Sequence, residues 1–148
     1  MVALEDERVR MSYEVAIYRE QLSMLRREME RISLTSMDMS NALQSVEKLE
    51  KKQVLVPIGG GVFVKSAITD TKILMPIGAE FITEMEKDDA GREIRRRIEA
   101  TNMAISKLNE EFEKINRKLR DVAVRLREAE QSVKLSQRVE EGVKEDYI

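Results

Sequence analysis

Two long segments of this chain carry apolar residues at the spacing of a coiled coil. If Met1 is placed at heptad position a, every a and d position from Met11 to Val46 is apolar except Ser36. A second segment repeats the pattern from Ile94 to Ser136, where only Thr101 and Ser136 are polar. Spacing of this kind, sustained between charged flanks, is typical of coiled-coil helices. It predicts a mainly α fold with helices over residues 1–52 and 88–141.

The segment between the helices, residues 53–87, reads as β structure that nearly repeats itself. The stretch VLVPIG at Val54–Gly59 returns as ILMPIG at Ile73–Gly78. Each copy ends in residues that favour a tight turn, Gly59-Gly60-Gly61 in the first and Gly78-Ala79 in the second. Each proline lies near a turn, where the missing N–H costs a ladder little. We therefore predict two β-hairpins.

The two helices are similar in length, roughly 70 Å each at ~1.5 Å per residue. They are expected to fold back on each other as an antiparallel coiled-coil hairpin. In that register Ser36 falls near Thr101, so the two seam defects are predicted to form one polar layer, unless their match is a coincidence. Asp88 and Asp89 are candidate N-caps of the second helix. Residues 142–148 are predicted to be a flexible tail, because Gly142 weakens helix.

An isolated hairpin is marginally stable in water, and these two lack a core of their own. Their strands are nearly continuous apolar runs, which invite pairing at exposed edges. We therefore predict that the hairpins join an inter-subunit β-barrel platform. The predicted oligomerisation residues are Val54, Leu55, Val56, Ile58, Val62, Phe63, Val64, Ile73, Leu74, Ile77, Phe81 and Ile82.

Composition argues against several classes of function. The 148 residues include no cysteine and no histidine, which removes the usual thiol nucleophile, general base and soft metal ligands, so neither an enzyme, a metal site nor a cofactor is expected. The 26 basic and 28 acidic residues are interspersed, giving no electrostatic reason to expect nucleic acid. The charged N-terminus and the short apolar runs indicate neither a signal peptide nor a membrane span. A soluble cytoplasmic protein is expected.

The order helix, two hairpins, helix, with VLVPIGGGVFVK and ILMPIGAEF in the middle, resembles the prefoldin family over nearly the whole chain. Two hairpins rather than one match its alpha class. The resemblance implies a hexamer of two alpha and four beta subunits, with a double β-barrel platform from which six coiled coils project. It also implies that the coiled-coil tips hold unfolded proteins without nucleotide and that these clients pass to a group II chaperonin.

The seam weakens toward the chain termini, where Arg8 and Glu140 take a positions and Ser136 a d position. We expect these last turns to fray. The predicted client-binding residues are Val2, Leu4, Val9, Met11, Val133, Leu135, Val139 and Val143. Without the resemblance, ordinary surface exposure would explain them better; with it, client binding is favoured for the region.

Three further points remain open. Ile17, Met24, Leu34, Met37 and Val124 lie off the seam and are interpreted as scattered exposure or contacts with neighbouring subunits, ahead of a cavity lining for clients. The basic cluster at residues 92–97 is interpreted as a solvated face, ahead of an ion-pair site for another subunit. The alternative function is a coiled-coil spacer or tether that oligomerises through its hairpins and binds a specific folded partner.

Overall fold

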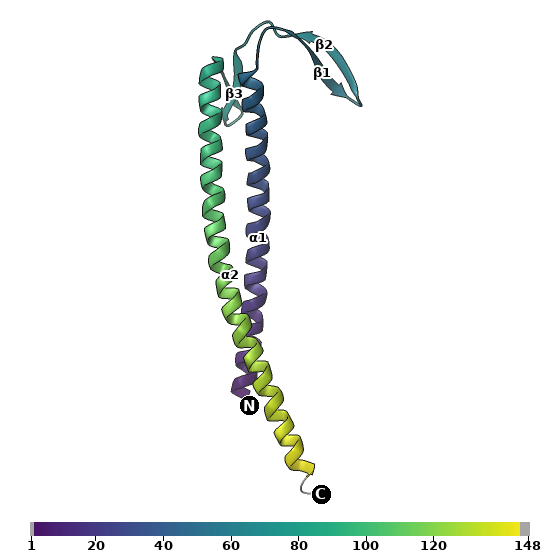
Figure 1. Ribbon diagram of the computed structural model, residues 1–148, viewed down its shortest axis with the longest axis vertical. Helices are drawn as coiled ribbons and strands as arrows, with labels where there is room; N and C mark the ends of the chain where they lie inside the picture. The colour runs from purple at the N-terminus through teal and green to yellow at the C-terminus, as the bar shows by residue number, and fades with distance from the viewer. Residues whose placement is uncertain (1, 146–148) are drawn as a thin grey trace. The chain divides into compact units, whose positions relative to one another are not determined.

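The computed structural model describes residues 2–145, with side chains described up to Val143. Along the chain, one long helix precedes four short strands and a second long helix follows them (Figure 1). The elements are α1 (Val2–Glu47), β1 (Gln53–Gly59), β2 (Val62–Ala67), β3 (Ile73–Gly78), β4 (Phe81–Met85) and α2 (Lys87–Glu145). The predicted fold class is confirmed. The strands form two separate two-stranded antiparallel sheets, β1–β2 and β3–β4, so a barrel would require strands from other chains.

The helix ends differ from the expected boundaries. α1 ends at Glu47 rather than at residue 52, and α2 continues through Gly142 to Glu145. Residues 142–145 are therefore helical rather than part of a tail, and residues 146–148 lie outside the described chain. Both helices are continuous through the weak part of the seam within residues 2–145.

The start of α2 corrects the predicted cap. The amide N–H of Ala90 donates to the carbonyl of Glu86 at 2.9 Å, so helical bonding begins from Glu86. Asp88 and Asp89 lie inside the first turn instead of preceding it. At this place their carboxylates interact favourably with the positive end of the helix dipole. This explains the acidic residues as well as an N-cap role would.

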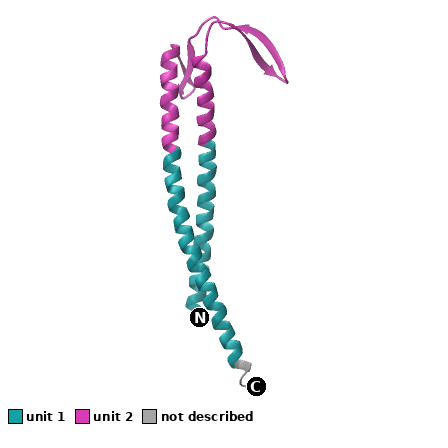
Figure 2. Cartoon of the chain, in the orientation of Figure 1, with its two compact units in different colours: residues 1–31, 105–148 teal, residues 32–104 magenta. Residues whose placement is uncertain are grey.

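The chain divides into two compact units (Figure 2). Unit 1 comprises residues 1–31 and 105–148, and unit 2 comprises residues 32–104 with both hairpins. The core of unit 1 is formed by Met11, Val15 and Val122. The core of unit 2 is formed by Val46, Ala90 and Ile94 of the helices together with Met75 of β3. Each unit thus has an apolar seam of its own.

The helices run antiparallel in both units. In unit 1, a guanidinium nitrogen of Arg125 lies 3.9 Å from a carboxylate oxygen of Glu7. The guanidinium of Arg26 lies 5.7 Å from the centre of the Phe112 ring. In unit 2, the hydroxyl of Ser36 donates to the side-chain oxygen of Asn102 at 3.2 Å. Ser36 thus bonds to the residue that follows Thr101 on α2. The Thr101 hydroxyl donates instead to the Arg97 carbonyl one turn earlier, at 2.7 Å, a common local bond of threonine in helices.

Both hairpins close with the same backbone geometry. The ladder slips between Pro57 and Gly59 in one and between Pro76 and Gly78 in the other. In the first turn Gly60 and Gly61 have φ of 56° and 78°. Ala79 and Glu80, in the same places of the second turn, have φ of 48° and 64°. Two central residues with positive φ are the signature of a type I′ turn, which matches the twist of the strands.

Candidate functional site

The β3–β4 hairpin is anchored to the helices of its own chain. Met75 is 5% exposed and packs in one cluster with Val46, Ala90 and Ile94. Ile73 and Met85 are partly buried against the same cluster. Ile73 was predicted to contact another subunit, but it lies on the inward face of β3. The burial of Met75 was not predicted, although alternation along a strand places Met75 and Ile73 on one face and Leu74 on the other.

The remaining predicted oligomerisation residues are exposed, apart from the half-buried Val54. In β1–β2 the exposed fractions are 63% for Leu55 and 57% for Phe63, two residues from different strands. In β3–β4 they reach 68% for both Leu74 and Phe81. The rest of the exposed set is Val56, Ile58, Val62, Val64, Ile77 and Ile82. Apolar side chains gathered on short strands with a free edge usually mark an interaction surface.

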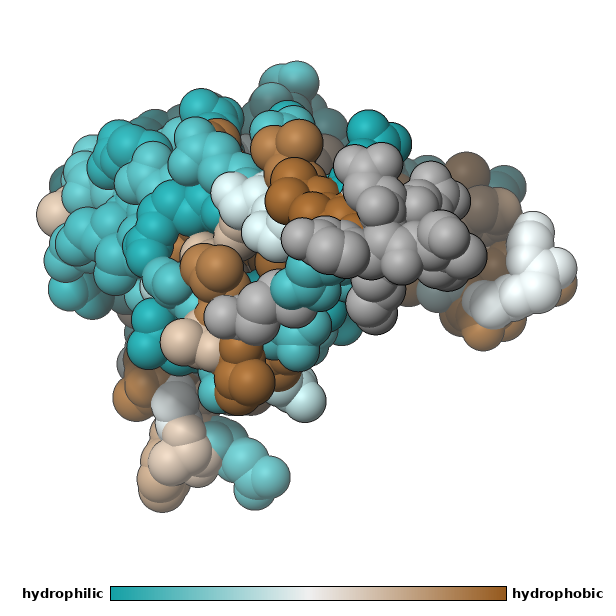
Figure 3. All heavy atoms as spheres, turned by 90° about the horizontal axis from the view of Figure 1, so that it is seen from below, coloured by the Kyte–Doolittle hydropathy of each residue, from teal (hydrophilic) through white to brown (hydrophobic). Residues whose placement is uncertain are grey.

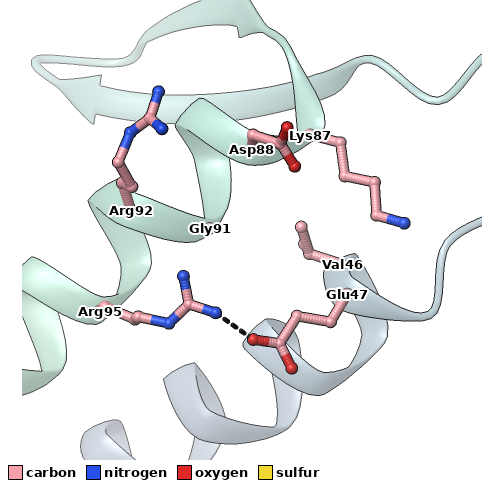
Figure 4. A pocket seen from close by; sticks show the side chains of 7 residues that line it. All are labelled: Val46, Glu47, Lys87, Asp88, Gly91, Arg92 and Arg95. Atoms are coloured by element: carbon pink, nitrogen blue, oxygen red, sulfur yellow. Dashed lines mark hydrogen bonds and ion pairs between the residues drawn. The ribbon is translucent and has the colours of Figure 1, made fainter.

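The helix ends beside the hairpins carry basic residues that are paired within the chain. Arg95 binds Glu47 across the two helices, and Arg92 binds Asp89 on its own helix. Both arginines line a cavity of about 340 Å³ in unit 2 (Figure 4), together with Val46, Glu47, Lys87, Asp88 and Gly91. The Lys87 ammonium donates to the carbonyl of Leu49 at 3.0 Å. This intrachain pairing fits the interpretation of a solvated face.

Glu93 is the centre of this charged network. It accepts hydrogen bonds from Arg96, with both N···O distances at 3.0 Å, and from Arg97 at 2.8 Å. These bonds lower the pKa of Glu93 to about 2. Arg97 also donates to the backbone carbonyl of Pro76 at 2.8 Å, and so links α2 to β3. Sequence reasoning placed Arg97 in a basic cluster but gave no signal for this contact.

The terminal ends of the helices, in unit 1, expose most of the predicted client-binding residues. The exposed fractions are 74% for Val2, 42% for Leu4, 46% for Val9, 63% for Leu135, 65% for Val139 and 55% for Val143. We call these six residues the terminal apolar set. Leu135, Val139 and Val143 follow one another at intervals of four and so share one face of α2. On the end that Figure 3 views, apolar residues lie beside hydrophilic ones.

Two predicted client-binding residues are buried instead. Met11 is 3% exposed in the core of unit 1, and Val133 is 9% exposed. Met11 lies at a d position and Val133 at an a position, where the neighbouring helix covers them, so the seam is intact closer to the termini than predicted. Sequence reasoning also missed Tyr13, which is 69% exposed and lines a cavity of about 400 Å³ with Arg8, Val9 and Glu130.

A model of the prefoldin subunit family matches residues 18–132 of the chain. The chain belongs to the prefoldin family. It is 31% identical to the prefoldin alpha subunit of Methanococcus aeolicus over 72% of this chain and 78% of the relative. It is 25% identical to the prefoldin alpha subunit of Pyrococcus horikoshii over 82% of this chain and 86% of that one. The predicted resemblance to archaeal alpha-class prefoldin subunits is thereby confirmed.

Solved prefoldin structures share the fold. A chain of the filamentous prefoldin of Methanocaldococcus jannaschii aligns with a TM-score of 0.66 at 24% identity, over 77% of this chain and 98% of its own length. The prefoldin beta subunit of Thermococcus strain KS-1 aligns with a TM-score of 0.61 at 20% identity, over 82% and 90%. Prefoldins are oligomeric chaperones, and this chain is a member with the helical coiled-coil architecture of the family. Within residues 2–145 neither helix contains an apolar stretch long enough to cross a bilayer.

Proposed function

We propose that this prefoldin is the alpha-class subunit of a cytoplasmic holdase that works without nucleotide. Two copies would assemble with four beta-class subunits through the hairpins. The coiled-coil ends would capture unfolded proteins and deliver them to a group II chaperonin. The proposal assigns no role to nucleic acid, membrane, metal or cofactor.

Assembly is supported by the exposed hairpin faces. Leu55, Ile58 and Phe63 in β1–β2, and Leu74, Phe81 and Ile82 in β3–β4, are each more than half exposed in the single chain. Burying such side chains is favourable by about 1.5–3 kcal/mol each when they leave water completely. Strands from beta-class subunits would cover these faces and pair the free strand edges.

Client capture is carried by one observation, the exposure of the terminal apolar set in unit 1. Its six members are medium-sized and spread over two helices, and the cavity beside Tyr13 includes one of them, Val9. An unfolded protein offers scattered apolar side chains, so many weak contacts suit it better than one specific site. Several arms that bind the same client gain avidity without any strong single contact.

The test is aggregation of a chemically unfolded protein diluted into buffer with the assembled complex and no nucleotide. In the variant, Leu135→Gln, Val139→Gln and Val143→Gln remove the apolar face of α2, while glutamine keeps good helix propensity. We expect the variant to require about threefold more complex for the same suppression, because the partner arms retain their own contacts.

The control variant carries Arg138→Gln and Glu141→Gln, two exposed polar positions of the same stretch whose charges cancel. It should suppress aggregation as the unchanged complex does. If the apolar variant suppresses equally well, this subunit's ends do not hold clients. If the unchanged complex suppresses nothing, the spacer or tether function replaces the holdase.

A further inference from the structure

The two hairpins are held to their chain in different ways. At the base of β1–β2, the amide of Ile68 donates to the carbonyl of Lys52 at 2.8 Å and so closes the hairpin on itself. Its strands expose almost every apolar side chain. β3–β4 instead buries Met75 against Val46, Ala90 and Ile94 and presents its other face outward. Only the second hairpin is part of the core cluster of unit 2.

The carbonyl that Arg97 binds lies at an irregular place in β3. Pro76 pairs with Ile82, and the ladder slips before the next pair, Gly78 with Phe81. Proline has no N–H to give to the ladder, so the backbone around Pro76 is the least tied part of the strand. The guanidinium of Arg97 donates to the Pro76 carbonyl at 2.8 Å, next to the buried Met75.

Arg97 is itself held in place. Its Nε donates to Glu93 one turn earlier at 2.8 Å, which leaves another nitrogen of the planar fork for Pro76. Its side chain is 34% exposed and that of Glu93 is 23% exposed, so water screens this pair less than a fully exposed one. Arg96 binds the same carboxylate but its side chain is 76% exposed, and the contacts described for it are to Glu93.

We propose that Arg97 is a positioning residue for assembly, which fixes the pose of the β3–β4 hairpin on α2 so that its apolar face meets the partner subunit. This inference rests on the assembly with beta-class subunits proposed above. Met75 holds the hairpin by packing, which has no direction of its own. The Arg97 fork adds a directional contact next to it, and so limits the tilt of the strand that carries Leu74 and Ile77.

The test uses the full chain mixed with a beta-class prefoldin subunit, with assembly followed by analytical ultracentrifugation over a range of concentrations. We expect Arg97→Ala to raise the concentration at half assembly about tenfold, the effect of losing one hydrogen bond to a charged group. Arg97→Lys should recover part of the loss, because an ammonium reaches one acceptor where the fork reaches two. Arg96→Ala removes a contact with the same Glu93 but none with the hairpin, so its concentration at half assembly should stay within about twofold of the unchanged chain.

A second readout separates positioning from helix stability. Amide hydrogen exchange should become faster in residues 73–85 of the Arg97→Ala chain and stay unchanged there in Arg96→Ala, while thermal unfolding of the helices shifts alike in both. The proposal is overturned if Arg96→Ala weakens assembly as much as Arg97→Ala, or if Arg97→Ala assembles normally. Neither readout involves a client, so a failed holdase test would leave this result intact.

Discussion

At the scale of residues, charge is balanced by local pairing. Glu93 accepts from two arginines that lie three and four residues further along α2. A second, exposed pair of this kind joins Arg31 and Glu28 on α1, and its hydrogen bond lowers the pKa of Glu28. Helical surfaces rich in both charges use such pairs routinely, each with a small effect on stability. Glu93 differs because its partner also reaches a strand.

The pairing of Glu93 predicts a pH dependence of stability. Its pKa is about 2 in the folded chain and has an ordinary value of 4.5. The carboxylate therefore contributes stability that is complete above the ordinary pKa and is lost as the pH falls through the folded one. Thermal unfolding followed by circular dichroism should show Glu93→Gln less stable than the unchanged chain at neutral pH, with the difference shrinking between about pH 5 and pH 2.

Glu99→Gln, at an exposed position of the same helix, is the control for removing one negative charge. Glu99→Gln should leave the change of thermal stability with pH, over this range, nearly as it is in the unchanged chain. A Glu93→Gln chain whose stability follows the unchanged chain at every pH would contradict the assignment.

Adjacent residues of β3 should have opposite effects on folding and assembly. Met75→Ala removes a side chain that is 5% exposed and should lower the free energy of unfolding by about 2–4 kcal/mol. Leu74→Ala, at a position 68% exposed, should change unfolding by under about 0.5 kcal/mol and weaken assembly with a beta-class subunit instead. Denaturant titration of the single chain and ultracentrifugation of the mixture measure the two effects. Equal unfolding losses would show that β3 does not lie with Met75 inward.

At the scale of elements, the two hairpins differ in the residues that form their turns. Both turns need positive φ at their two central residues. The first turn meets this with Gly60 and Gly61, whereas the second uses Ala79 and Glu80. A residue with a side chain is strained in this region by roughly 1 kcal/mol. This strained turn belongs to the hairpin whose β3 is also held by packing and by Arg97.

Relieving that strain should stabilise the second hairpin. Glu80→Gly is expected to raise the free energy of unfolding by about 0.5–1 kcal/mol, the strain relieved less the extra freedom of the unfolded chain. Gly61→Ala, at the equivalent place in the first turn, should lower the free energy of unfolding by a similar amount. Denaturant unfolding of both single variants measures the pair. A destabilising Glu80→Gly would mean that the second turn is not of the I′ type.

Heptad spacing and turn residues located each helix and strand to within a few residues, because periodicity and turn chemistry are local properties of the sequence. Contacts across the seam were harder. Ser36 bonds to Asn102, the residue after Thr101, and the Thr101 hydroxyl bonds to the backbone of its own helix. Met11 and Val133 are buried because the apolar seam still covers them, whereas Leu4, on the terminal side of Arg8, is 42% exposed. The inward pose of Ile73 depends on packing between distant segments.

At the scale of the whole molecule, the two kinds of exposed apolar surface belong to different units. The hairpin faces lie in unit 2, and the terminal apolar set lies in unit 1. One is built of short strands with free edges, which favour ordered pairing with a fixed partner. The other is built of scattered side chains on helices, which favour weak contact with many. We therefore propose that the hairpin faces serve subunit assembly and the terminal apolar set serves client capture.

Photo-crosslinking from one position in each surface tests this division most directly. A photoreactive amino acid replaces Val139 in one chain and Phe63 in another, and each is assembled with beta-class subunits before an unfolded, labelled client is added. The account predicts client adducts from position 139 and beta- or alpha-subunit adducts from position 63. Client adducts from position 63, or none from position 139 in a complex that still suppresses aggregation, would contradict it.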